Sequence, residues 1–359
     1  MRKLSLLFLF ITLFNLNISA QRKTENVILI TLDGARLQEV FGGFDVELYK
    51  KIQKDADKQD LYKKYWSDSN EAEREKLMPF FWQVWMKNHG SIAGNRNLKS
   101  EVKTTNNHLF SYPGYSEIVT GEAHDNIINS NKRIQNKFPS FLQFLQKKMN
   151  LNSNQVASFA SWNVMNEIVT TDTNAFLVNA GYENYVSTDA AAQRLSAQQF
   201  ETPTPWDSVR HDYYTFRLAM SHLKNFRPRV LHIGLGETDD WAHDGRYDMV
   251  INALHRTDKY FRELWEFLEN DRQYKGKTSI IVTVDHGRGS TEKDWGDHGK
   301  DVPEARCIWI AFVSPDVNLR GEWKDAKTLY QNQIAATLCK LLGFDYAEQN
   351  RQAGKAIDF

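Results

Sequence analysis

The chain has 359 residues, of which 41% are hydrophobic and 25% charged, and its 45 basic and 45 acidic side chains give a formal net charge of zero. This length allows one large α/β domain, or a core domain with an inserted cap. A neutral balance gives no electrostatic basis for nucleic-acid binding, so no nucleic-acid partner is expected. The two cysteines, Cys307 and Cys339, are interpreted as small buried hydrophobic residues, with a disulfide as the alternative in an exported protein.

The first twenty residues predict a cleaved secretory signal. A positive start at Met1-Arg2-Lys3 precedes an almost wholly apolar run, and small residues end the segment at Ala20. We therefore expect a signal peptide over 1–20, cut before Gln21, and a secreted or periplasmic mature chain over 21–359 with no transmembrane anchor. A membrane anchor is the alternative, but the run is short for a bilayer core of about 30 Å.

The mature chain begins with a continuous apolar run over 26–32, which suits a central parallel strand. Asp33 follows directly, where open α/β sheets place their ligands, although an Asp there also caps a following helix. Residues 44–88 are rich in Lys, Glu, Tyr and Trp and predict helical elaboration of the core.

A second candidate lies within residues 109–121. Pro113 suits the first turn of a helix and Gly121 its end, which places Ser111 just ahead of the helix N-terminus. The Ser111 hydroxyl is then either a plain N-cap or, if a metal ion lowers its pKa, a nucleophile.

Strand and helix patterns alternate through the rest of the chain, with strands over 156–160, 230–235, 278–284 and 306–313, helices over 138–148, 213–226, 248–269 and 333–342, and a possible cap segment at about 165–210. This alternation predicts an α/β fold in which helices cover both faces of a mostly parallel central sheet.

Two further strand ends carry carboxylate and imidazole side chains. Asp239 and His243 are four residues apart, so a helical turn places them on one face. Asp285 and His286 follow the strand at 278–284, and His298 comes twelve residues later. Together with Asp33 these residues are enough to hold two divalent ions and leave room for substrate; Zn²⁺ suits the set best, with Mn²⁺ as the alternative.

At this point the chain resembles the alkaline phosphatase superfamily, in particular its type I phosphodiesterase/nucleotide pyrophosphatase and metalloenzyme branches. Five pieces carry the resemblance in order, and they span about residues 26 to 343: Leu32-Asp33-Gly34, Ser111-Tyr112-Pro113 through Gly121, Glu237-Thr238-Asp239 through His243, Asp285-His286-Gly287, and His298-Gly299.

The resemblance implies a role for each residue. One metal would be held by Asp239, His243 and His298. The other would be held by Asp33, Asp285 and His286, with Ser111 as its remaining ligand and as the nucleophile that is phosphorylated. Phosphodiesterase relatives also carry an Asn that binds a non-bridging oxygen of the substrate, and Asn129 is its expected counterpart.

The predicted function is an exported two-metal hydrolase of small-molecule or glycan-linked phosphate esters, with monoester and diester equally open. Arg36 and Arg288, and also Lys132 and Arg133, are candidates to bind the anionic substrate, with a structural ion pair as the alternative for each. Alternatives within the superfamily are a sulfate-ester or phosphonate hydrolase and a mutase, the last disfavoured by export. A non-catalytic binding protein is the remaining alternative.

Three residues depart from the patterns of the relatives. Ser111 stands where the phosphodiesterase branch usually has Thr, Gly114 where that branch has Asn, and Tyr115 where sulfatases have Arg. The first two weaken the transfer of diesterase specificity, and the third disfavours a sulfatase.

Overall fold

The computed structural model describes residues 22–324 and 327–359, so the expected signal segment at 1–20 lies outside the described residues. Its centre is an eight-stranded sheet with the order β10-β2-β9-β7-β1-β6-β4-β5. Neighbouring strands run parallel except around β9, which is antiparallel to both β7 and β2. A separate three-stranded sheet has the order β11-β3-β8. The predicted mostly parallel α/β fold is confirmed.

The strands have the following bounds: β1 Asn26–Leu32, β2 Gly90–Ala93, β3 Glu101–Lys103, β4 Val156–Ala160, β5 Leu177–Ala180, β6 Val230–Leu235, β7 Thr278–Thr283, β8 Cys307–Ile308, β9 Ile310–Val313, β10 Gly321–Glu322 and β11 Thr328–Tyr330. Every residue of β1, β4, β6 and β7 is buried. Complete burial is expected for parallel strands that helices cover on both faces of the sheet, because neither face of such a strand meets water. The single run predicted over 306–313 is two strands, β8 and β9, which belong to different sheets.

The register of the central strands determines where the chain leaves the sheet. Leu32 of β1 is paired with Leu235 of β6, and Thr31 is paired with Thr283 of β7. The three parallel strands therefore end at one level. The residues that follow them, beginning at Asp33, Gly236 and Val284, emerge side by side at the carboxyl edge of the sheet, where open α/β sheets bind ligands.

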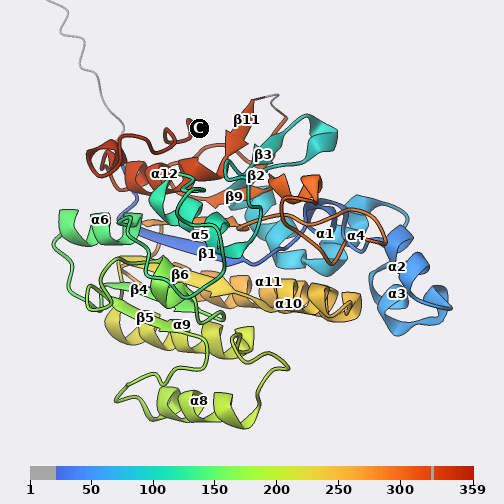
Figure 1. Cartoon of the computed structure of the whole chain (residues 1–359), viewed down its shortest axis with the longest axis horizontal. Coiled ribbons are helices and arrows are strands. Elements are labelled where there is room, and N and C mark those ends of the chain that lie inside the picture. The colour runs from blue at the N-terminus through green and yellow to red at the C-terminus, as the bar shows by residue number, and fades with distance from the viewer. Residues whose placement is uncertain (1–21, 325–326) are drawn as a thin grey trace, which may run out of the picture.

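The helices have the following bounds: α1 Leu37–Gly42, α2 Val46–Ile52, η1 Ala56–Lys58, α3 Asp60–Tyr65, α4 Asn70–Leu77, the π-helical η2 Phe81–His89, η3 Arg96–Leu98, α5 Ser111–Thr120, α6 Phe141–Lys148, α7 Met165–Ile168, α8 Ala190–Glu201, α9 Asp212–Phe226, α10 Glu237–His243, α11 Tyr247–Asn270, η4 Pro303–Arg306, η5 Gln331–Gln333, α12 Ile334–Leu341 and η6 Tyr346–Glu348. In Figure 1, α5, α6 and α12 are drawn above β1, and α9, α10 and α11 below it. Among the described residues, none of these helices is both long enough and apolar enough to cross a bilayer.

The segments expected to lie outside the core differ in their role. Residues 44–88 hold α2, η1, α3, α4 and η2, and in Figure 1 α2 and α3 extend from one end of the sheet. Residues 165–210, expected as a cap, instead contain β5, the edge strand of the main sheet, together with α8. Cys307 and Cys339 are free thiols, and Cys339 is buried.

Candidate metal centre at the strand ends

Five parts of the chain bring the predicted ligands together. Asp33 directly follows β1, Asp239 and His243 lie on α10, and Asp285 and His286 follow β7. His298 comes from the loop between β7 and η4, and Ser111 is the first residue of α5 rather than the residue ahead of it. All seven residues predicted as metal ligands therefore meet at the carboxyl edge of the sheet.

His286 lies at the middle of the cluster. Its Nε2 is 3.3 Å from Asp285 Oδ2 and 3.5 Å from Asp33 Oδ1. The Ser111 hydroxyl oxygen lies 3.4 Å from the same Nε2. Ligand atoms of Asp33, Asp285 and His286 all lie within 4.8 Å of one another, close enough to share a single ion.

The second group adjoins the first. Asp239 Oδ2 is 3.2 Å from His243 Nε2, as expected for residues one turn apart on α10. His243 Nε2 is 3.0 Å from His298 Nε2, and Asp239 Oδ1 is 3.8 Å from that same atom. Asp239 Oδ1 is also 3.7 Å from His286 Nε2, so the two groups share a border.

Backbone carbonyls fix the imidazole rings. His286 Nδ1 is 2.9 Å from the carbonyl oxygen of Gly287, and His298 Nδ1 is 3.2 Å from that of Leu109. A carbonyl only accepts, so each Nδ1 carries the proton and each Nε2 presents its lone pair to the cluster. Metal-binding histidines are commonly oriented by such a second contact.

The cluster buries more carboxylates than cationic side chains, which shifts the pKa values of its members. Burial and the neighbouring Asp239 raise the pKa of Asp33 well above its usual range, and burial and Asp33 do the same to the pKa of Asp285. Burial alone would also raise the pKa of Asp239, but the Arg288 guanidinium and the histidines hold it well below its usual range. Burial and the nearby His286 lower the pKa of His298 to about 2, which leaves its ring neutral, the form that binds metal.

The residues fit a pair of divalent cations. Asp33 Oδ1 and Asp285 Oδ2 are buried and accept no hydrogen bond from the described part of the chain. Buried carboxylate oxygens of this kind are costly unless a hydrogen bond or a cation satisfies them. Both point toward His286 Nε2, and carboxylate with imidazole is the donor set that Zn²⁺ and Mn²⁺ accept.

The two arginines expected to bind substrate are bound by carboxylates of the protein. Arg36 is buried, forms an ion pair with Glu39 and donates to the Gly289 carbonyl at 3.1 Å. Arg288 is also buried, forms an ion pair with Asp239 and donates to the Asp239 carbonyl at 3.0 Å. A buried guanidinium requires such a partner, so both side chains brace the loops around the cluster.

Arg133 is similarly engaged, because two of its nitrogens donate to Glu167 Oε1 at 3.0 and 2.8 Å. Asn129, expected to bind a non-bridging oxygen of the substrate, is exposed, and its role stays a prediction. Asn131, two residues later, places its side-chain oxygen 2.9 Å from the Tyr112 backbone nitrogen, beside Ser111 at the start of α5.

Two residues that first appeared only as departures are part of the site. Tyr115 lies one turn after Ser111 on α5 and donates its hydroxyl to Asp33 Oδ2 at 3.1 Å. Gly114 lies against the backbone of Asp285, where an added Cβ would be 2.8 Å from the carbonyl carbon. The small residue therefore lets α5 approach the β7 end closely. That Tyr115 contacts a predicted metal ligand could have been expected from its four-residue spacing from Ser111, which places both on one face of α5.

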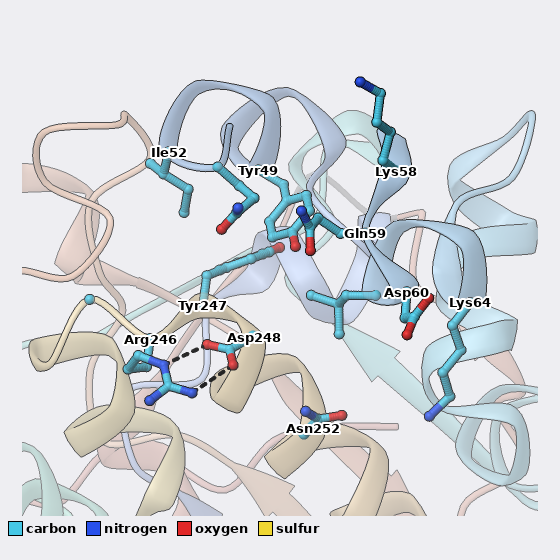
Figure 2. Close-up of a pocket in the computed structure, with 13 residues that line it drawn as sticks. Tyr49, Ile52, Lys58, Gln59, Asp60, Lys64, Arg246, Tyr247, Asp248 and Asn252 are labelled. Atoms are coloured by element: carbon cyan, nitrogen blue, oxygen red, sulfur yellow. Dashed lines mark hydrogen bonds and ion pairs between the residues drawn. The ribbon is translucent and has the colours of Figure 1, made fainter. Parts of the chain in front are cut away.

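A separate cavity of about 730 Å³ opens beyond α10 (Figure 2). It is lined by residues of the helical elaboration and of the start of α11, among them Tyr49, Lys58, Lys64, Arg246 and Asp248. Arg246 and Asp248 pair with each other at 2.8 Å across its floor. None of its lining residues belongs to the Asp/His cluster.

Fold and cluster together define a class: α/β chains whose mostly parallel sheet ends in a metal-type Asp/His cluster beside a helix-borne hydroxyl. This is the fold of the alkaline phosphatase superfamily, as the sequence predicted. No known family model and no curated protein matches the chain.

Solved structures of this fold match over most of the chain. The lipoteichoic acid synthase LtaP from Listeria monocytogenes is 12% identical, with a TM-score of 0.57, over 91% of this chain and 74% of that one. The phosphonate monoester hydrolase SpPMH from Silicibacter pomeroyi is 11% identical, with a TM-score of 0.53, over 93% and 76%. A Bacteroides thetaiotaomicron sulfatase for glycosaminoglycans is 14% identical, with a TM-score of 0.53, over 93% and 75%. At these identities the likeness establishes the fold alone.

Proposed function

We propose that the chain is an exported hydrolase of phosphate esters that uses two divalent metal ions and Ser111 as its nucleophile. The observation that carries the proposal is the position of the Ser111 hydroxyl, 3.4 Å from His286 Nε2 at the border of a buried Asp/His cluster. A serine that merely capped its helix would need no such neighbours. Here the helix instead begins at Ser111 itself.

Bound metal ions would supply Lewis-acid stabilisation of the attacking and leaving oxygens. Asp33, Asp285 and His286 would hold one ion, and Asp239, His243 and His298 the other. Ser111 Oγ attacks phosphorus, the bond to the leaving-group oxygen breaks, and the phosphoryl group remains on Ser111 until water releases it. The dipole of α5 favours an anion at its start, although the Tyr112 N–H is already donated to Asn131 and Pro113 has no N–H.

Asn131 is the residue that we assign to a non-bridging oxygen of the substrate. Its side-chain oxygen accepts from the Tyr112 backbone nitrogen at 2.9 Å, which fixes the amide and directs its NH₂ group away from that contact. The side chain is otherwise exposed at the start of α5. An oriented donor there would stabilise charge that develops on the phosphoryl oxygens.

The charge of the cluster favours a substrate with a single negative charge. Asp33, Asp239 and Asp285 with Arg288 leave a net charge of minus two, which two divalent cations would change to plus two. Deprotonated Ser111 and a diester monoanion together then neutralise the site. A monoester dianion would need a further cation, and of the candidates Arg36, Arg133 and Arg288 are bound to carboxylates, so only Lys132, exposed beside Asn131, would be left for that role. A phosphonate monoester carries the same single charge as a diester, and is the second candidate.

Steady-state rates on an aryl phosphate diester, a phosphate monoester, a phosphonate monoester and a sulfate ester test this proposal. We expect the two monoanionic phosphorus esters to be hydrolysed fastest. The variant Ser111→Ala should abolish their turnover, while metal analysis still finds about two ions per chain. Full activity in Ser111→Ala would remove Ser111 as the nucleophile, and a preference for sulfate would overturn the substrate class.

A further inference from the structure

The loop that leads into α5 has an unusual backbone. Leu109, two residues before Ser111, has φ of +55°, in the left-handed region that a branched aliphatic side chain rarely adopts. Leu109 is buried, and its N–H donates to the side-chain oxygen of Asn106 at 2.9 Å. Its carbonyl is the group that accepts from His298 Nδ1 at 3.2 Å. The strained residue therefore joins the serine helix to a ligand of the second metal group.

A buried carboxylate holds the other end of this loop. Glu117 is fully buried on α5, and its two oxygens accept four hydrogen bonds from the loop. Oε1 accepts from the Thr105 backbone nitrogen at 2.8 Å and from its hydroxyl at 2.9 Å. Oε2 accepts from the Asn106 backbone nitrogen and side-chain nitrogen, both at 2.8 Å. The Asn106 amide is thus fixed from both ends, by Glu117 and by Leu109.

We propose that Glu117 and Asn106 are positioning residues, which hold Leu109 in its left-handed conformation and so aim His298 at the metal while setting its distance from Ser111. The inference rests on the proposed metal-dependent function. It predicts a chain of effects from Glu117 through Asn106 and Leu109 to His298. Glu117, Asn106 and Leu109 are not among the predicted metal ligands, so they would act through His298.

The structure also explains why an acid serves here. Four donors converge on Glu117, and only a carboxylate presents enough acceptor sites and no donor. An amide would turn an NH₂ group toward two of those donors. Burying a carboxylate costs more free energy than burying an uncharged side chain, so Glu117 is explained by the loop conformation that its four hydrogen bonds hold.

The first experiment compares Asn106→Ala with Asn136→Ala in the full mature chain. Asn136 is a matched control, because it is also a buried asparagine, follows α5, and accepts from the Phe138 backbone nitrogen at 3.0 Å. Zn²⁺ affinity is measured by competition with a chromophoric chelator. Loss of a group that orients a metal ligand typically costs about 10- to 100-fold in metal affinity. We expect that loss for one of the two ions in Asn106→Ala, a lower kcat at similar KM, and wild-type affinity in Asn136→Ala.

A second pair of variants separates backbone conformation from packing, and covers the case in which Asn106→Ala fails to fold. Glycine adopts positive φ freely, whereas a β-branched residue resists it. Leu109→Gly should therefore bind Zn²⁺ more tightly than Leu109→Val, although valine better fills the space. Tighter Zn²⁺ binding by Leu109→Val than by Leu109→Gly would overturn the inference and leave the proposed function intact. Wild-type Zn²⁺ affinity in Asn106→Ala would do the same. A wild-type chain that binds no divalent ion would instead overturn both.

Discussion

Gly114 offers the sharpest test of how α5 is placed. An added Cβ at this position would lie 2.8 Å from the carbonyl carbon of Asp285, about 0.6 Å inside the 3.4 Å at which ordinary contacts begin, and the carbonyl oxygen is nearer still. The opposing atoms are backbone, so no rotamer change relieves the contact. Gly114→Ala must move α5 away from the end of β7, by a distance on the order of 1 Å.

The consequence for activity follows from the position of Ser111, three residues before Gly114 on the same helix. A misplacement of about 1 Å in a reacting group costs roughly 100-fold in rate. The free energy of unfolding should change less, because about 1 kcal/mol of better helix propensity offsets an overpacking cost of about 1–3 kcal/mol. We therefore expect Gly114→Ala to remain folded while its kcat/KM on an aryl phosphate diester drops by about two orders of magnitude.

The assay pairs that rate with thermal unfolding and with Zn²⁺ content. Gly42→Ala is the control, because Gly42 is also helical and an added Cβ there meets its nearest atom at 3.9 Å. It should behave as wild type. A Gly114→Ala variant with wild-type kcat/KM would show that the close approach of α5 to Asp285 has no part in the geometry of the site.

Two further predictions concern single hydrogen-bonding groups. Tyr115→Phe removes the donor to Asp33 Oδ2 and should lower kcat/KM by about 10- to 100-fold, because a hydrogen bond to a charged group contributes about 1.5–3 kcal/mol; unchanged kinetics would refute this. Burial lowers the pKa of His232 to about 3, against about 6.5 in the unfolded chain. Below pH 6.5 the unfolded state alone binds this proton, so the free energy of unfolding falls by about 2 kcal/mol from pH 7 to pH 5. In His232→Gln, denaturant unfolding at pH 7 and pH 5 should show a fall in the free energy of unfolding that is smaller by about 2 kcal/mol than in the wild type. The same fall in both proteins would contradict this prediction.

The predictable part of this fold is the part with strong local patterns. The apolar runs at β1, β6 and β7 predict buried parallel strands because neither face of such a strand tolerates polar side chains. Their ends then bring Asp33, Asp239 and Asp285 to one edge without any knowledge of tertiary contacts. The ligand set could be proposed from sequence for this reason.

What sequence did not predict depends on distances across the fold. Whether Arg288 meets substrate or protein is decided by Asp239, which is 49 residues away along the chain. The contact of Asn131 with the Tyr112 backbone nitrogen was not predicted, because the path of the loop after α5, rather than a residue count, determines which side chain returns to the helix start. The left-handed backbone of Leu109 was also not predicted, because leucine, unlike glycine or asparagine, gives no indication of a positive φ.

The same fold carries proteins titled as a lipoteichoic acid synthase, a phosphonate monoester hydrolase and a sulfatase, so the substrate must be decided by a few side chains. Position 115 illustrates how. In sulfatases this position is arginine, which adds a cation beside the reacting group. Here Tyr115 instead donates a neutral hydrogen bond to Asp33, which favours the charged form of that carboxylate against the burial that raises its pKa. Under the proposed function, metal ions would supply the positive charge that the carboxylate-bound Arg36 and Arg288 do not, and we propose for this reason that a monoanionic phosphorus ester suits the site.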